Sequence, residues 1–228
     1  MNDSYTKERQ YQVLLEYRDK HGLESLGLMS SQCWYDDPKR LVFMLSRYKF
    51  VAKMLAGCER VLEIGCADAF GSRIVLQEVK ELTAIDFDPL FVKDANLRMD
   101  TRWGFSCYVH DMLQEPVSGV FDGIYAIDVL EHILPENEDL FLKNALDSLS
   151  DHGTLIIGIP TLESQAFASQ ISKEGHVNCK TMPDLRNTMR RYFHNVFMFS
   201  LNDEVVHTGF HKMAHYVFAL CCGKRVAA

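Results

Sequence analysis

The sequence predicts an α/β fold in which a mostly parallel, seven-stranded sheet has helices on both faces, with a helical segment at the N-terminus. Two observations predict it. From residue 60 onward, short apolar runs alternate with helical patterns, which is typical of a parallel sheet. In the last third, two apolar runs flank the turn-rich segment 202–212, as expected of an antiparallel pair.

The N-terminal region is expected to be helical. Residues 4–20 form an amphipathic pattern that ends at His21-Gly22, and residues 23–35 are less regular. Asp37-Pro38 is a helix start, with the aspartate as N-cap and the proline in the first turn, and Gly57 ends that helix. We therefore expect a helical cap at residues 1–56 and a core domain at residues 57–228.

The core elements follow in order. Strands are predicted at residues 61–66, 82–85, 105–109, 121–127 and 154–159, and then at 196–201 and 215–220. Helices are predicted at residues 70–77, 89–99, 138–149 and 182–192, with a turn at residues 151–153. These lengths suit one domain.

Composition excludes several classes of protein. The 228 residues suffice for a full core, and the formal charge of −7 argues against a general nucleic-acid binder. The seven cysteines are scattered without a CxxC pair, which favours reduced thiols in a cytoplasmic protein. The first residues have no apolar signal core, and no apolar stretch is long enough to span a membrane.

The most informative stretch is the turn after the first core strand. The apolar run 61–64 contains Glu63 and leads through Gly65, Cys66 and Ala67 into a helical pattern. A small-residue turn between a strand and a helix lets a ligand approach the backbone closely, and it directs amides of the next helix toward that ligand. The turn predicts a nucleotide-like ligand.

Later strand ends carry acidic residues. Asp86 ends the second strand 23 residues after Glu63, where a carboxylate can accept from both hydroxyls of a ribose, and Phe87 can lie against a base. Asp111 ends the third strand and Asp128 the fourth. A single aspartate after a strand is often only a turn or cap residue, but three in order favour a shared ligand.

Nicotinamide cofactors use a similar strand, glycine turn and later carboxylate. Their fingerprint, GxGxxG, needs two more glycines after Gly65, but those positions are Ala67 and Phe70. A close approach of a pyrophosphate is therefore disfavoured.

Four segments resemble motifs of class I S-adenosylmethionine-dependent methyltransferases. Residues 61–71 resemble the first motif and residues 84–89 the second, while residues 121–133 and 176–185 are similar to the branch that includes ubiquinone-biosynthesis O-methyltransferases. The resemblance implies a Rossmann-like sheet with an antiparallel last strand, and S-adenosyl-L-methionine as cofactor. Ala67 and Ala69 depart from the pattern, where glycine is commoner.

The resemblance also implies that the helical cap at residues 1–56 covers the acceptor side of a methyltransferase core at residues 57–228, and it implies roles for individual residues. Glu63 would order the turn, and the Gly65 backbone would meet the methionine moiety. Asp86 would take the ribose, whereas Asp111 and the Met112 backbone would take the adenine.

Two histidines are candidate catalytic residues. A hydroxyl or amine acceptor needs a base if it is protonated, and His132 and His176 lie near the fourth and fifth strand ends. Each is alternatively a structural histidine. Asp128, Glu131 and His132 also have the spacing that places ligands on one helical face, and some relatives hold a divalent ion with such a segment; His176 would complete the set.

The sequence therefore predicts an S-adenosylmethionine-dependent methyltransferase acting on a hydroxyl of a small molecule, with an amine as the second choice. A sugar, a cell-surface precursor or a secondary metabolite would each fit as acceptor. The alternatives are a nucleotide-cofactor oxidoreductase of the NAD type and a non-catalytic binding module.

Overall fold

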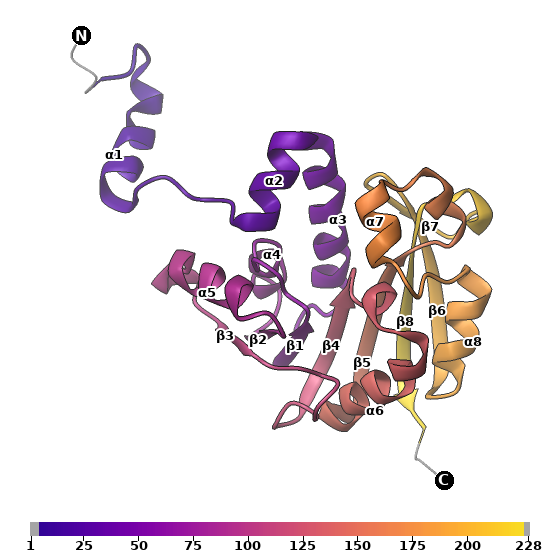
Figure 1. Cartoon of the computed structure of the whole chain (residues 1–228). Coiled ribbons are helices and arrows are strands. Elements are labelled where there is room, and N and C mark those ends of the chain that lie inside the picture. The colour runs from indigo at the N-terminus through magenta and orange to yellow at the C-terminus, as the bar shows by residue number, and fades with distance from the viewer. Residues whose placement is uncertain (1–4, 226–228) are drawn as a thin grey trace.

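The computed structural model describes residues 5–225 and contains one mixed sheet flanked by helices (Figure 1). Within these residues the eight strands lie in the order β3-β2-β1-β4-β5-β8-β6-β7. Their bounds are β1 Arg60–Ile64, β2 Glu81–Asp86, β3 Ser106–Val109, β4 Phe121–Ile127, β5 Leu149–Pro160, β6 Phe193–Asn202, β7 Val205–His207 and β8 Tyr216–Lys224.

Helices α1, α2 and α3 precede β1, and the other helices lie in connections between strands. Their bounds are α1 Gln12–His21, α2 Leu28–Asp36, α3 Pro38–Met54, α4 Ser72–Leu76, α5 Pro89–Arg98, α6 Glu138–Ser148, α7 Gln170–Gly175 and α8 Met182–Arg190. As the sequence predicts, Asp37 and Asp88 cap α3 and α5 by accepting hydrogen bonds from the amides of Lys39 and Leu90.

The strand directions confirm the predicted fold class. β3, β2, β1, β4 and β5 are parallel, whereas β8 runs antiparallel to both β5 and β6. The sheet has one strand more than expected, because the turn-rich segment 202–212 includes β7, which pairs with the end of β6. Asp203 adopts a φ of 49° in the tight turn between them.

Two further local differences concern secondary structure. Residues 28–36 form α2 where an irregular segment is expected, because a tertiary contact described below fixes the start of this helix. Residues 151–153 continue β5 instead of forming a turn.

The core lies on both faces of the sheet. Alternate residues of β4 point to opposite faces: Ile124 and Ala126 pack in the cluster with α6 and α8, whereas Tyr125 and Ile127 pack in the cluster with α3 and α4. α5 covers the same face as α3 and α4 through Ala95, which contacts Ala84 of β2. Both faces are thus buried, as a parallel sheet requires.

The N-terminal helices differ in how they pack. α3 lies along the sheet and buries Val51 and Ala52 in the core. α1 stands apart from the rest of the chain (Figure 1), and none of its residues is buried. Among residues 5–225, no helix is long and apolar enough to cross a membrane.

Candidate functional site

A cavity of about 580 Å³ lies beyond the carboxyl ends of β1, β2 and β4. This is where open α/β sheets bind ligands. Eight of the predicted site residues line it: Gly65, Ala67, Asp86, Phe87, Asp111, Met112, Asp128 and His132. Glu63, Cys66 and His176 do not line it.

The turn after β1 forms one wall of the cavity. Gly65 has a φ of +75°, and a Cβ at this position would come within 2.4 Å of a Val129 methyl carbon. Only glycine fits there without displacing its neighbour. Ala67 and Ala69 also adopt left-handed backbone conformations, with φ values of 46° and 54°, as expected where relatives have glycine.

Asp86 fixes this turn to the second strand. Its buried carboxylate accepts hydrogen bonds from the amide of Ala67 at 2.8 Å and from the amide of Asp88 at 2.9 Å. Asp111 acts similarly in its own turn, accepting from the Leu113 amide at 2.8 Å. Both aspartates therefore have the turn role considered from the sequence, and both also face the cavity, where their remaining lone pairs are free for a ligand.

Phe87 and Met112 contribute apolar surface to the cavity. Phe87 is 73% exposed and stands at the rim, whereas Met112 is buried. The Met112 carbonyl accepts a hydrogen bond from the buried Asn144 side chain of α6 at 2.7 Å, which holds this backbone segment in place.

Glu63 lies beneath the turn and away from the cavity. Its side chain is 1% exposed, and burial raises its pKa to about 7, while the hydroxyls of Ser72 and Tyr125 act in the opposite direction. A buried carboxyl next to hydroxyl groups suits a role in supporting the turn.

Asp68 is a site residue that the sequence interpretation missed. Its buried carboxylate accepts from the Ser30 amide at 2.7 Å and the Ser30 hydroxyl at 3.2 Å, and from the Phe70 amide at 3.2 Å. It thereby fixes α2 to the turn after β1, and Met29 of α2 lines the cavity. A carboxylate in a turn gives no sign in the sequence that its partner lies 38 residues upstream.

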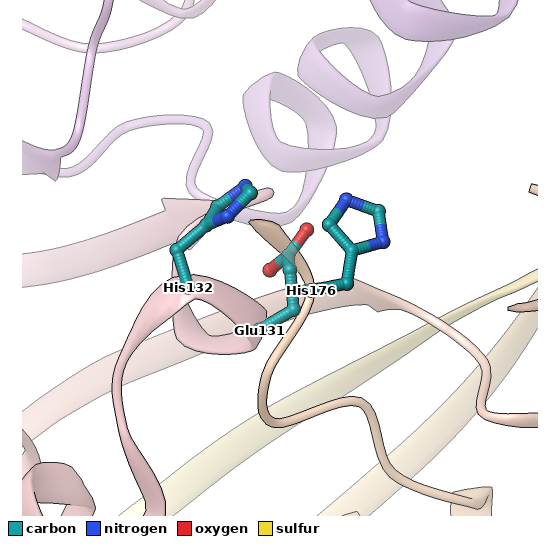
Figure 2. Close-up of side chains that lie close together, drawn as sticks. All are labelled: Glu131, His132 and His176. Carbon is teal, nitrogen blue, oxygen red and sulfur yellow. The ribbon is translucent and has the colours of Figure 1, made fainter. Parts of the chain in front are cut away.

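The two candidate catalytic histidines, His132 and His176, lie next to each other, with ring centres 5.1 Å apart. Glu131 and His132 lie in the short 3-10 turn Leu130–His132 after β4, and His176 follows α7. One ligating atom from each of the three side chains lies within 4.8 Å of the other two. Figure 2 shows the imidazoles with the Glu131 carboxyl group between them.

Hydrogen bonds orient both imidazoles. The Nδ1 atom of His132 donates to the Gly175 carbonyl at 2.9 Å, and the Nδ1 atom of His176 donates to the Gln165 side-chain oxygen at 2.8 Å. Each neutral ring therefore keeps its Nε2 atom as an acceptor. Burial and the neighbouring His132 lower the pKa of His176, which favours this neutral form.

Glu131 is the least satisfied group of the cluster. Its side chain is 1% exposed, and neither carboxyl oxygen has a hydrogen-bond partner. Burial, and secondly the charge of Asp128, raise its pKa well above the ordinary value. A buried carboxyl group of this kind is stable when it is protonated or when it binds a cation.

Asp128 is paired with a residue of the N-terminal region. Its carboxylate forms an ion pair with Arg47 of α3, whose guanidinium lies 3.8 Å from the centre of the Tyr216 ring. Although burial alone would lower the pKa of Arg47, Asp128 raises it and the net shift is upward. Asp128 thus lines the cavity but is not one of the three close ligating residues.

The donor set fits a divalent transition-metal ion. One carboxylate and two imidazoles are ligands that zinc and iron accept. Ligating histidines usually donate their other N–H to a carbonyl or carboxylate, as both do here. Without an ion, the Nε2 atoms of both imidazoles remain as hydrogen-bond acceptors beside the Glu131 carboxyl group.

Comparisons with known proteins agree with this geometry. Residues 62–155 match the family model described as a methyltransferase domain. That segment includes the turn after β1 and the ends of β2, β3 and β4. No curated protein matches the chain.

Several solved structures share the fold. The N-methyltransferase NodS from Bradyrhizobium japonicum WM9, in complex with S-adenosyl-L-homocysteine, matches with a TM-score of 0.65 and 18% identity over 95% of this chain and 99% of NodS. The methyltransferase domain of bacterial CtHen1-C gives 0.64 and 14% over 79% and 98%. The plantazolicin methyltransferase BpumL, also in complex with S-adenosyl-L-homocysteine, gives 0.62 and 14% over 85% and 94%.

These likenesses show the Rossmann-like methyltransferase fold, and the matched residues 62–155 include the strands whose ends line the cavity. The likeness to the ubiquinone-type branch stays a prediction. The match over residues 62–155, which is less than half of the chain, and the shared fold support an enzyme that uses S-adenosyl-L-methionine as its methyl donor.

Proposed function

We propose that the protein transfers a methyl group from S-adenosyl-L-methionine to a hydroxyl of a small molecule, with an amine as the alternative acceptor. The observation that carries the choice of acceptor is the cluster of Glu131, His132 and His176 next to the cavity. A neutral hydroxyl is a weak nucleophile and needs a base or a metal ion, and this cluster can supply either. An uncharged amine needs neither.

The donor site would use the residues predicted from the sequence. The Gly65 and Ala67 backbone would meet the methionine moiety, Asp86 the ribose, and Asp111 and Met112 the adenine, with Phe87 against its face. Support comes from their shared position along one cavity. Glu63 would act from beneath the turn, and Cys66 would contribute only its backbone.

In this proposal the acceptor lies between the methyl donor and the histidines. The sulfonium of the donor is already activated, so the protein mainly aligns the acceptor and excludes water. The Nε2 atom of His132 or His176 would take the acceptor proton. His132 lines the cavity and is the closer candidate, whereas His176 lies behind it.

The same cluster of three side chains could alternatively bind a divalent ion. Glu131, His132 and His176 would hold it, and the ion would lower the pKa of the acceptor hydroxyl. Asp128 would stay with Arg47.

We further propose that the N-terminal region, residues 1–56, covers the acceptor side through α2 and α3, since α1 stands apart. Three contacts support this: Ser30 binds Asp68 of the cofactor turn, Met29 lines the cavity, and Arg47 binds Asp128 at its edge. The exposed aromatic residues of this region, Tyr11, Tyr17, Trp34 and Tyr35, are not among the residues that line the cavity.

Calorimetric titration separates the possible ligands. S-adenosylhomocysteine is expected to bind, and NAD is expected not to bind. Tight NAD binding with no response to S-adenosylhomocysteine would refute the proposal. Methyl transfer from labelled S-adenosylmethionine is then measured on matched hydroxyl and amine acceptors, and transfer to amines alone would refute the choice of hydroxyl.

The roles of the histidines are tested with His132→Ala and His176→Ala, each assayed with and without a chelator. Loss of rate in both variants, with a chelator-insensitive wild type, supports a base. Loss of wild-type activity to the chelator and its recovery with added zinc or manganese supports the metal reading. Unchanged rates in every case would contradict both. His152→Ala, in an exposed stretch of β5, serves as the control substitution.

A further inference from the structure

Two cysteines lie close together at the turn that follows β1. Cys66 lies between Gly65 and Ala67, and Cys107 lies on β3 at the edge of the parallel half of the sheet. Their sulfur atoms are 3.9 Å apart although the residues are 41 positions apart in the chain. The buried residues that cluster with Cys66 are small: Ala69, Ala84 and Ala95.

The two thiols differ in exposure and acidity. Cys66 is 1% exposed, whereas Cys107 is half-buried. The hydrogen bond from Cys66 lowers the pKa of Cys107, while the same contact and burial raise the pKa of Cys66. Since the thiolate is the reactive form, the more accessible Cys107 is the thiol that reacts first with an oxidant.

We propose that Cys66 and Cys107 form a reversible disulfide, and that this modification weakens binding of the methyl donor. Hydrogen peroxide is a sufficient oxidant. The Cys107 thiol loses its proton, and the thiolate attacks one peroxide oxygen. The O–O bond breaks, a sulfenic acid forms, and the departing hydroxide takes up the proton to give water. The Cys66 thiol then attacks the Cys107 sulfur, the S–O bond breaks, and a second water leaves. Two thiols lose two electrons, and one peroxide gains them.

The link to the donor site follows from the geometry and depends on the proposed function. A disulfide has sulfur atoms about 2 Å apart, so the sulfurs must approach by about 2 Å. Cys66 cannot move alone, because Gly65 and Ala67 on either side line the cavity. The amides of Gly65 and Cys66 both bind the Ile85 carbonyl, at 2.8 and 3.0 Å, and the Ala67 amide binds Asp86. Displacement of Cys66 therefore strains the turn that meets the donor.

The modification itself is tested by mass spectrometry of the full-length protein. After treatment with hydrogen peroxide and alkylation of the remaining thiols, a peptide that links Cys66 to Cys107 is expected. Dithiothreitol should remove it. Absence of this peptide under conditions that oxidise other cysteines would overturn the proposal.

The functional consequence is tested by titration with S-adenosylhomocysteine. Oxidised protein is expected to bind about tenfold more weakly than reduced protein, with full recovery in dithiothreitol. Cys107→Ser should bind normally and be insensitive to peroxide, whereas Cys222→Ser, a half-buried cysteine on β8, should respond as the wild type does. The effect on donor binding would be refuted if peroxide lowered the affinity of Cys107→Ser as much as that of the wild type. It would also be refuted if wild-type protein with the disulfide formed bound S-adenosylhomocysteine as tightly as reduced protein.

The two proposals fail in different ways. If the reduced protein does not bind S-adenosylhomocysteine, the proposed function fails, but the linked peptide remains measurable. If the reduced protein binds and no linked peptide forms, only the disulfide is refuted.

Discussion

Glu63→Gln tests whether a buried carboxyl group supports the cofactor turn. The pKa of Glu63 rises from an ordinary 4.5 to about 7 in the folded protein, first because of burial. A raised folded pKa means that this residue's contribution to stability is complete below pH 4.5 and is lost as the pH rises through about 7. The full difference corresponds to about 3 kcal/mol. Glutamine has no such titration.

The assay is urea unfolding of wild type and Glu63→Gln at about pH 5 and about pH 8. The free energy of unfolding of the variant, relative to wild type, should increase by about 2–3 kcal/mol between these values. Other titrating groups are common to both proteins and cancel in the difference. Glu59→Gln makes the same substitution at an exposed position just before β1 and is the control. The reasoning would be refuted if the free energy of unfolding differed between Glu63→Gln and wild type by the same amount at both pH values.

Three further outcomes are expected. Gly65→Ala should weaken S-adenosylhomocysteine binding roughly tenfold in calorimetry, because the added methyl overlaps Val129 and the φ of +75° strains alanine; unchanged affinity would contradict this. Asp68→Asn should lower the free energy of unfolding, measured in urea, by about 1–3 kcal/mol, because the asparagine NH₂ group would replace one of the two carboxylate oxygens that accept hydrogen bonds from Ser30. Protection of the α2 amides from hydrogen exchange should fall as well. If His176 is the base, the rate should fall in acid with an apparent pKa below 6.5, because only the neutral ring accepts a proton; a profile flat down to pH 5 would exclude that role.

The sequence alone determined the fold class and the order of its elements. Periodic apolar runs and helix caps are local signals, so the capping roles of Asp37 and Asp88 could be predicted from neighbouring residues. The carboxyl ends of parallel strands lie along one edge of the sheet, and for this reason the positions of Gly65, Asp86 and Asp111 at consecutive strand ends were enough to assign them to one cavity.

Contacts between distant segments were beyond the reach of the sequence. The helix at residues 28–36 has weak local signals and depends on Asp68, and the ion pair of Asp128 with Arg47 joins residues 81 positions apart. Many partners are compatible with any one aspartate or cysteine, and only packing selects among them.

The same limit applies to the catalytic cluster. The spacing of Glu131 and His132 was visible in the chain, but the approach of His176 depends on the loop after β5, where the amides of residues 177 and 178 bind the Glu131 carbonyl at 2.8 and 2.9 Å. The sequence thus placed the cavity residues at consecutive strand ends, and its resemblance to a known family indicated the donor. The tertiary structure decided which groups stand beside it, because burial and orientation are set by residues far away in the chain.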